Sequence, residues 1–169
     1  MKNIMKVLFV CFNNVTRSQA AKAFYNELTN SHDAESAGIN VEHHYPDADT
    51  MEKYGTRKNA PSAAWQAMSE RGLDVADSPR IHLTLEILNG GGYDLVVNLA
   101  ERDQTPDWLH GDKVIWWDIV DPSKEKDFDK RLAQSRTVLD LVKARVEKLI
   151  EVEKAGGDFH ELDDNINGE

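Results

Sequence analysis

The chain has 169 residues, of which 40% are hydrophobic and 30% charged, and its formal net charge is −10. This composition suits one globular α/β domain rather than a disordered chain, and it argues against a general nucleic-acid binder, because phosphate backbones bind basic surfaces. No apolar run approaches the roughly 18 residues that span a membrane, the N-terminal segment lacks signal-peptide features, and a lone cysteine excludes an internal disulfide. We therefore expect a cytoplasmic protein with no nucleic-acid or membrane partner.

The first third of the chain predicts two strands around one helix. A continuous apolar run over residues 4–10 is typical of a buried strand in a parallel sheet. Apolar positions on one face predict a helix over 17–28, and a short strand is expected over 34–38. Turn-forming residues then predict a long loop over 40–60.

The rest of the chain continues this alternation. A helix is expected over 60–71, beginning near Pro61, and a shorter one over 83–88, ahead of three glycines. Apolar runs over 93–99 and 113–117 predict two more strands. A long amphipathic helix follows Pro122. Its apolar stripe consists of Phe128, Leu132, Ser135, Leu139, Val142, Val146 and Leu149.

Strands that alternate with helices predict an α/β fold. We expect a single-domain three-layer sandwich with a four-stranded parallel sheet and helices on both faces. Residues 1–154 form this domain, and the acidic tail 155–169 is expected to be frayed. Because ligands bind beyond the carboxyl ends of parallel strands, Cys11, Asp118 and Asp121 are expected to converge on one crevice.

Cys11, the only cysteine, opens a loop between the first strand and the first helix, with the sequence CFNNVTRS over 11–18. Backbone N–H groups in such a loop point at one spot, and the helix dipole adds positive charge there. This field would hold an anion and favour a thiolate on Cys11, while Arg17 could bind two oxygens of a tetrahedral oxyanion. The loop alone is equally compatible with a buried, inert cysteine and an ordinary exposed arginine.

A thiolate that attacks phosphorus needs an acid to protonate the departing oxygen. Asp121 is the candidate, because Pro122 biases it toward an extended conformation on an otherwise loose loop. The alternative is a plain Asp-Pro turn before the last helix. Asp118 is a rival acid, since position in the sequence does not separate the two.

Taken together, these motifs resemble the low-molecular-weight protein tyrosine phosphatases and the arsenate reductases that share their fold. The shared features are the Cys-x5-Arg-Ser loop, the Asp-Pro loop, Asn14, the sequence ESAG at 35–38 and the segment 67–84. The resemblance extends from about Lys6 to Ile150.

The resemblance assigns a role to each site residue. It implies that Cys11 forms a phosphocysteine, that Arg17 binds the oxyanion, and that Asp121 acts as acid and then as base. Ser18 would donate a hydrogen bond to the thiolate. Backbone N–H groups would hold the phosphate, and they belong to Phe12, Asn13, Asn14, Val15, Thr16 and Arg17. No metal or cofactor is implied.

Several departures from the family pattern keep the substrate open. Thr16 stands where many members have a second cysteine, Asn13 replaces a common glycine, and Ser123-Lys124 replaces the tyrosines of the eukaryotic phosphatases. The residues around Trp116-Trp117 look more like the arsenate-reductase branch. Thioredoxin-coupled arsenate reductases need further cysteines, so that mechanism is excluded.

Three functions follow from this interpretation. The first is hydrolysis of phosphate monoesters, with protein phosphotyrosine as the expected substrate. The second is a single-cysteine arsenate reductase that uses an external small thiol, and the third is a non-catalytic phosphate- or phosphopeptide-binding module. The expected partner is accordingly a phosphorylated protein, a small-molecule phosphate or arsenate.

Overall fold

The computed structural model describes residues 5–41, 62–75 and 78–164. Four strands form one parallel sheet in the order β2-β1-β3-β4. Their bounds are β1 Val7–Cys11, β2 Ala34–Gly38, β3 Leu95–Asn98 and β4 Val114–Trp116. The predicted α/β class with a four-stranded parallel sheet is confirmed.

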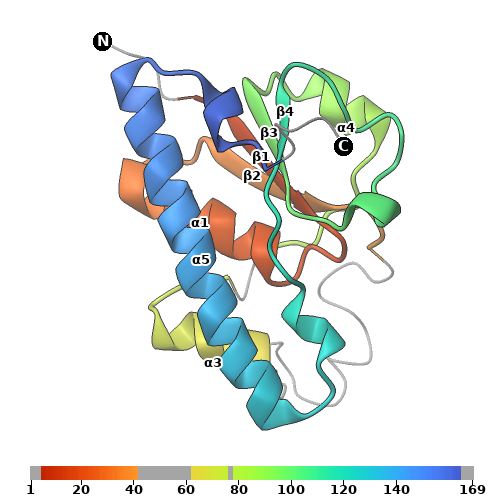
Figure 1. The fold of residues 1–169 in the computed structure, drawn as a ribbon, viewed down its shortest axis with the longest axis vertical. Coiled ribbons are helices and arrows are strands. Elements are labelled where there is room, and N and C mark those ends of the chain that lie inside the picture. Colours follow the sequence, from red (N-terminus) through yellow and green to blue (C-terminus); the bar gives the residue numbers. More distant parts are fainter. Residues whose placement is uncertain (1–4, 42–61, 76–77, 165–169) are drawn as a thin grey trace.

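Helices cover both faces of this sheet (Figure 1). One face carries α1 (Arg17–Thr29), α3 (Ala63–Glu70) and α5 (Phe128–Ala155), and the other carries α4 (Leu85–Gly90). The described residues also contain short 3-10 helices, which are η2 (Arg102–Gln104), η3 (Pro122–Lys124) and η4 (Phe159–Leu162). None of the helices in the described ranges combines the length and the apolar character needed to cross a membrane.

The central strand β1 is buried along its whole length. Phe9 packs on the helix-rich side, where its ring centroid lies 6.2 Å from that of Tyr25 and 6.0 Å from that of Trp117. Leu8 and Val10 pack on the opposite side, under α4. Since both faces of β1 are covered, its apolar residues run continuously, and the position of Cys11 at its end is fixed from both sides.

Two helix starts differ from the expectation because side-chain caps decide them. The helix expected from about Pro61 begins at Ala63, where the Ser62 Oγ accepts from the Trp65 N–H at 3.2 Å. The helix expected over 83–88 is α4, and the Thr84 Oγ1 caps it by accepting from the Ile87 N–H at 3.2 Å. Pro61 and most of the loop expected over 40–60 lie outside the described residues.

The tail departs from the expectation that residues 155–169 are frayed. Asp163 accepts from the Trp116 N–H at 3.0 Å, and Asp164 accepts from the Asp118 N–H at 2.7 Å. Arg145 holds both carboxylate oxygens of Asp164 at 2.9 Å. The acidic composition suggested solvation, yet these carboxylates accept from the N–H groups of Trp116, which ends the edge strand β4, and of Asp118, two residues beyond it. Residues 165–169 lie outside the described residues.

Candidate active site

The loop between β1 and α1 lies directly against the end of β2. Asn14 has a φ of 55°, in the left-handed region that asparagine adopts more readily than most residues. A Cβ on Gly38 would lie 2.8 Å from the Asn14 nitrogen and 2.9 Å from the Phe12 oxygen, so only glycine allows this approach. The loop is therefore shaped by close backbone contact as well as by its own sequence.

Cys11 and Ser18 face each other across this loop, with the sulfur 2.9 Å from the Ser18 Oγ. Asn14 donates to the same Oγ through Nδ2 at 2.7 Å. Cys11 is only 2% exposed, and Asn14 and Ser18 are fully buried. The predicted nucleophile and its predicted hydrogen-bond partner are thus brought together out of bulk water.

Arg17 is also buried, at 2% exposed, and two other loops hold its guanidinium. Nη1 donates to the Leu99 oxygen at 2.6 Å and to the Ile119 oxygen at 3.0 Å. Across residues 5–41, 62–75 and 78–164, neither Nε nor Nη2 donates a hydrogen bond. The side chain is therefore oriented in advance while keeping donors for an anion.

The structure separates the two candidate acids. Asp121 is 8% exposed and its Oδ2 lies 3.5 Å from Arg17 Nη2, while its Oδ1 accepts from the Ser123 N–H and hydroxyl at 2.9 and 2.8 Å. Asp118 is exposed, and its N–H is bound by the tail residue Asp164. Asp121 therefore joins the site of Arg17, whereas Asp118 belongs to the contact between β4 and the tail.

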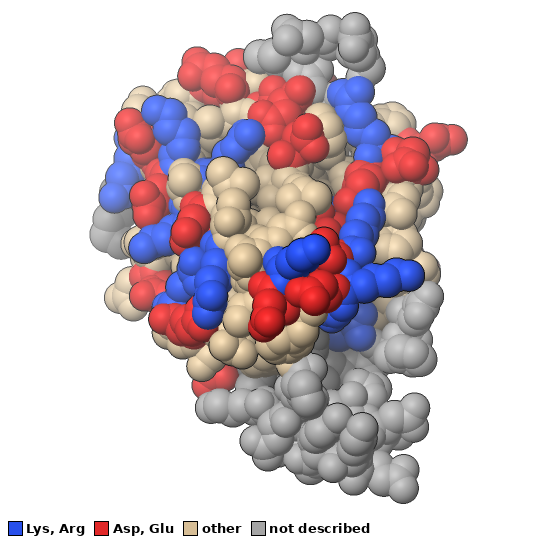
Figure 2. Space-filling view, turned by 60° about the horizontal axis from the view of Figure 1, so that its bottom comes forward, with Lys and Arg blue, Asp and Glu red and all other residues tan. Residues whose placement is uncertain are grey.

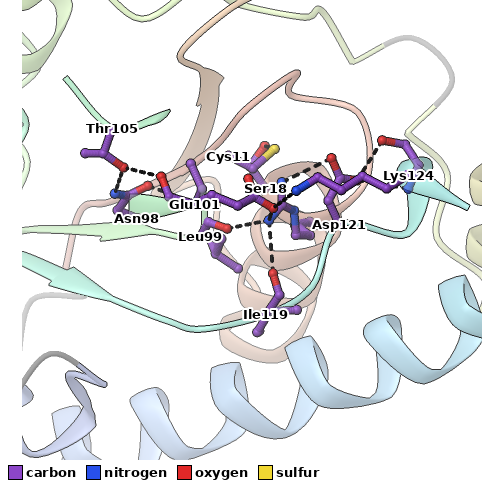
Figure 3. Close-up of polar contacts among 12 residues, drawn as sticks. Cys11, Ser18, Asn98, Leu99, Glu101, Thr105, Ile119, Asp121 and Lys124 are labelled. Atoms are coloured by element: carbon purple, nitrogen blue, oxygen red, sulfur yellow. Dashed lines mark hydrogen bonds and ion pairs between the residues drawn. The ribbon is translucent and has the colours of Figure 1, made fainter. Parts of the chain in front are cut away.

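Sequence reasoning missed Glu101, which follows β3. Its Oε1 accepts from Arg17 Nη1 at 3.3 Å and from Lys124 Nζ at 3.2 Å, so it links the arginine to the loop that carries Asp121 (Figure 3). Thr105 holds the backbone of this turn, because its hydroxyl donates to the backbone oxygen of Glu101 at 2.9 Å. The sequence offers one indication of this role: Glu101 lies just beyond the carboxyl end of a predicted interior strand, where ligands bind in parallel sheets.

The positive charge of this site is local. On the face shown in Figure 2, Lys and Arg side chains are interspersed with Asp and Glu, without a broad area of one sign. Arg17 itself is paired with Glu101 and Asp121. In the part of the chain that the structure describes, no group of three His, Cys, Asp or Glu side chains could hold a metal ion. The groups here that could bind an anion are the Arg17 guanidinium and the backbone N–H groups of the loop.

Comparison with known proteins gives relatives of two kinds. The model of the low molecular weight phosphotyrosine protein phosphatase family matches residues 6–156. A glutaredoxin arsenate reductase of Synechocystis sp. is 30% identical over 148 residues, which cover 86% of this chain and 95% of that protein.

Two solved structures show the same fold. One is an arsenate reductase in the phosphate binding state, with a TM-score of 0.62 and 27% identity, covering 88% of this chain and 98% of the other. The second is a low molecular weight protein tyrosine phosphatase from T. tengcongensis, with a TM-score of 0.62 and 24% identity, covering 88% and 99%.

Proposed function

The chain belongs to the low molecular weight phosphotyrosine protein phosphatase family, and we propose that it hydrolyses phosphate monoesters at Cys11. Its family and its arsenate reductase relatives make it a cysteine-dependent enzyme. One observation carries the choice of reaction: the buried carboxyl of Asp121 lies 3.5 Å from Nη2 of Arg17, the residue proposed to bind the oxyanion. An ester oxygen needs a proton to leave, and a carboxylic acid in this place can supply it.

The first step of the proposed reaction forms a phosphocysteine. Backbone N–H groups of residues 12–17 and the Nε and Nη2 donors of Arg17 hold the phosphate oxygens. The Cys11 sulfur forms a bond to phosphorus as the phosphorus–oxygen ester bond breaks. Protonated Asp121 gives its proton to the departing oxygen from Oδ2, since Oδ1 is occupied by Ser123.

The second step hydrolyses the phosphocysteine and regenerates the free enzyme. Asp121, now a carboxylate, takes a proton from a water molecule, whose oxygen bonds to phosphorus as the sulfur–phosphorus bond breaks. The thiolate that leaves accepts a hydrogen bond from Ser18, 2.9 Å from the sulfur. Inorganic phosphate is the second product, and Cys11 returns to its starting state.

We extend the proposal to protein phosphotyrosine as substrate, which the description of the family model supports. The proposed compartment is a reducing one, the cytoplasm, because Cys11 has no second cysteine with which to form a protective disulfide.

Arsenate reduction is a second candidate, favoured by relatives of 30% and 27% identity that are called arsenate reductases. Cys11 would displace water from arsenate to form a sulfur–arsenic bond. An external thiol would then attack the sulfur, releasing arsenite and leaving a mixed disulfide, and a second thiol would restore Cys11. Two external thiols thus supply the two electrons, because this chain has no other cysteine.

A parallel assay separates the two reactions. Hydrolysis of an aryl phosphate at about pH 5–7 and reduction of arsenate with glutathione or a dithiol are measured on the same preparation, with Cys11→Ser as control. We expect aryl-phosphate turnover without any added thiol beyond that which keeps Cys11 reduced. Arsenate reduction with no aryl-phosphate turnover would favour the second candidate instead, and neither activity in a folded protein that binds phosphate would contradict both.

A further inference from the structure

A continuous row of polar side chains leads from the surface of α1 to the sulfur of Cys11. We call it the polar row; from the surface inward its members are Lys22, Ser78, Gln19, Asn14 and Ser18. The three inner members are nearly or fully buried. A buried row of this kind has consequences for Cys11 only if its hydrogen bonds run in one direction.

The outer half of the row has a fixed direction. The Lys22 ammonium can only donate, and it donates to the Ser78 Oγ at 3.0 Å. The single hydrogen of Ser78 is then left for the Gln19 Oε1 at 2.7 Å. This orients the Gln19 amide so that Nε2 faces the Pro79 oxygen at 3.1 Å and the Asn14 oxygen at 3.3 Å, both of which can only accept.

The inner half is fixed by a backbone group. The Ile81 N–H can only donate, and it donates to the Asn14 Oδ1 at 2.9 Å. Gln19 Nε2 lies 3.4 Å from the same oxygen, so both neighbours present donors to it. Asn14 must therefore turn its Nδ2 toward the Ser18 Oγ, and the Ser18 hydrogen is left for the sulfur of Cys11.

Burial makes this direction costly to reverse. A flipped Asn14 amide would set its Nδ2 against the Ile81 N–H and leave both donors unpaired, one of them buried and the other partly buried, which is unfavourable. Arg80 adds to the same support by donating to the Asn13 oxygen at 2.8 and 3.1 Å. At the outer end, burial lowers the pKa of Lys22 while the charge of Glu35 opposes the shift, as expected for an ammonium held partly out of water.

We propose that Gln19 and Ser78 are positioning residues that fix the hydrogen bond from Ser18 to the sulfur of Cys11. Through Ser18 they favour the thiolate, although neither touches the substrate. The inference rests on the proposed function in taking Cys11 as the nucleophile, and it applies equally to ester hydrolysis and to arsenate reduction.

The test is the rate at which iodoacetamide alkylates Cys11, which is unambiguous because the chain has one cysteine. At about pH 6 we expect alkylation to slow about tenfold in Gln19→Leu and about threefold in Ser78→Ala, because less thiolate is present. At about pH 9, where the thiolate is abundant in every variant, the rates should converge. Lys143→Met, on the exposed face of α5, is the matched control and should behave like the unaltered protein at both pH values.

A second pair of variants shows whether the effect passes through Ser18. Gln19→Leu should slow alkylation no further in a Ser18→Ala background, because the effects of substitutions within one hydrogen-bond network are not additive. An equally large extra effect in that background would overturn the proposal, and so would unchanged rates in folded Gln19→Leu. If Gln19→Leu does not fold, Ser78→Ala at the half-buried end decides the question. Absence of aryl-phosphate turnover would contradict the proposed function alone, since alkylation needs no substrate.

Discussion

Two loops meet at Arg17, and the structure holds them in different ways. Residues 11–18, the anion loop, are held from inside by buried side chains and by the Ile81 N–H. Residues 118–124, the acid loop, have a buried contact at one end, where Arg17 donates to the Ile119 oxygen at 3.0 Å. Exposed contacts hold the rest: the pair between Glu101 and Lys124, whose side chain is 59% exposed, and the tail carboxylate of Asp164. The proposed nucleophile therefore lies in a loop held by buried contacts, and the proposed acid lies in a loop held by both buried and exposed contacts.

This difference teaches that the two halves of the site have different stabilities. Breaking a buried hydrogen bond costs the desolvation of the groups left behind, whereas an exposed ion pair contributes about 0–1 kcal/mol. The anion loop is therefore prepared before substrate arrives. The Lys124 end of the acid loop is held by weaker, exposed contacts, whereas Arg17 anchors its Ile119 end.

The largest effect is expected in Cys11→Ser, on the buried side. A hydroxyl in place of the thiolate removes the nucleophile, so turnover should be abolished, while the backbone N–H groups and Arg17 still bind oxyanions. Phosphate or vanadate should then raise the melting temperature of the variant about as much as that of the unaltered protein. Residual turnover close to normal would exclude Cys11 as the nucleophile.

The next effect distinguishes the carboxylates of the acid loop. Asp121→Asn should slow hydrolysis of phenyl phosphate, a substrate with a poor leaving group, by about 10²–10⁴-fold. Substrates whose leaving group departs unaided should suffer much less. Asp118→Asn is the matched control and should change little, because Asp118 is exposed and contacts the tail residue Asp164 through its backbone N–H, which the substitution keeps. A leaving-group dependence that appeared in Asp118→Asn alone would reverse the assignment.

Gly38→Ala tests the buried support of the anion loop. The new Cβ would lie 2.8 Å from the Asn14 nitrogen, so the loop must shift, and we expect a loss of about 1–3 kcal/mol in the free energy of unfolding. Phosphate binding should weaken with it, as measured by calorimetry. Gly90→Ala is the control, since nothing lies within 4 Å of a Cβ there and alanine favours a helix. Equal effects at both glycines would mean that close contact with β2 does not shape the loop.

The smallest effect is expected where the acid loop meets the sheet. Lys124→Met should lower kcat for phenyl phosphate about threefold and leave alkylation of Cys11 unchanged, because an exposed pair is weak and lies outside the polar row. Raising the salt concentration should reproduce this loss in the unaltered protein, since salt screens exposed pairs. Slower alkylation in Lys124→Met would show that the two loops are not independent.

The sequence predicted the features that depend on local pattern. Continuous apolar residues identified β1, and the spacing of Cys11, Arg17 and Ser18 located the anion loop. Contacts between distant segments could not be read in the same way. Asp118 and Asp121 look equivalent in the sequence, and contacts with distant segments separate them, because Asp121 pairs with Arg17 whereas the Asp118 N–H is bound by Asp164.

Two further misses have the same physical origin. Glu101 was overlooked because its role depends on Arg17 and Lys124, which reach it from other parts of the chain. The acidic tail was expected to fray because composition reports average solvation. Its aspartates instead accept from Trp116 at the end of an edge strand and from Asp118 just beyond it, and the local sequence of the tail does not indicate such contacts.

The most direct test is to trap the phosphorylated enzyme. Asp121→Asn is mixed with an aryl phosphate that has a good leaving group, the reaction is quenched, and the phosphorylated residue is identified by mass spectrometry. Formation needs no acid for such a substrate, while the loss of the base slows hydrolysis, so phosphocysteine should accumulate on Cys11. Turnover with no phosphate on Cys11, or with phosphate on another residue, would contradict the account.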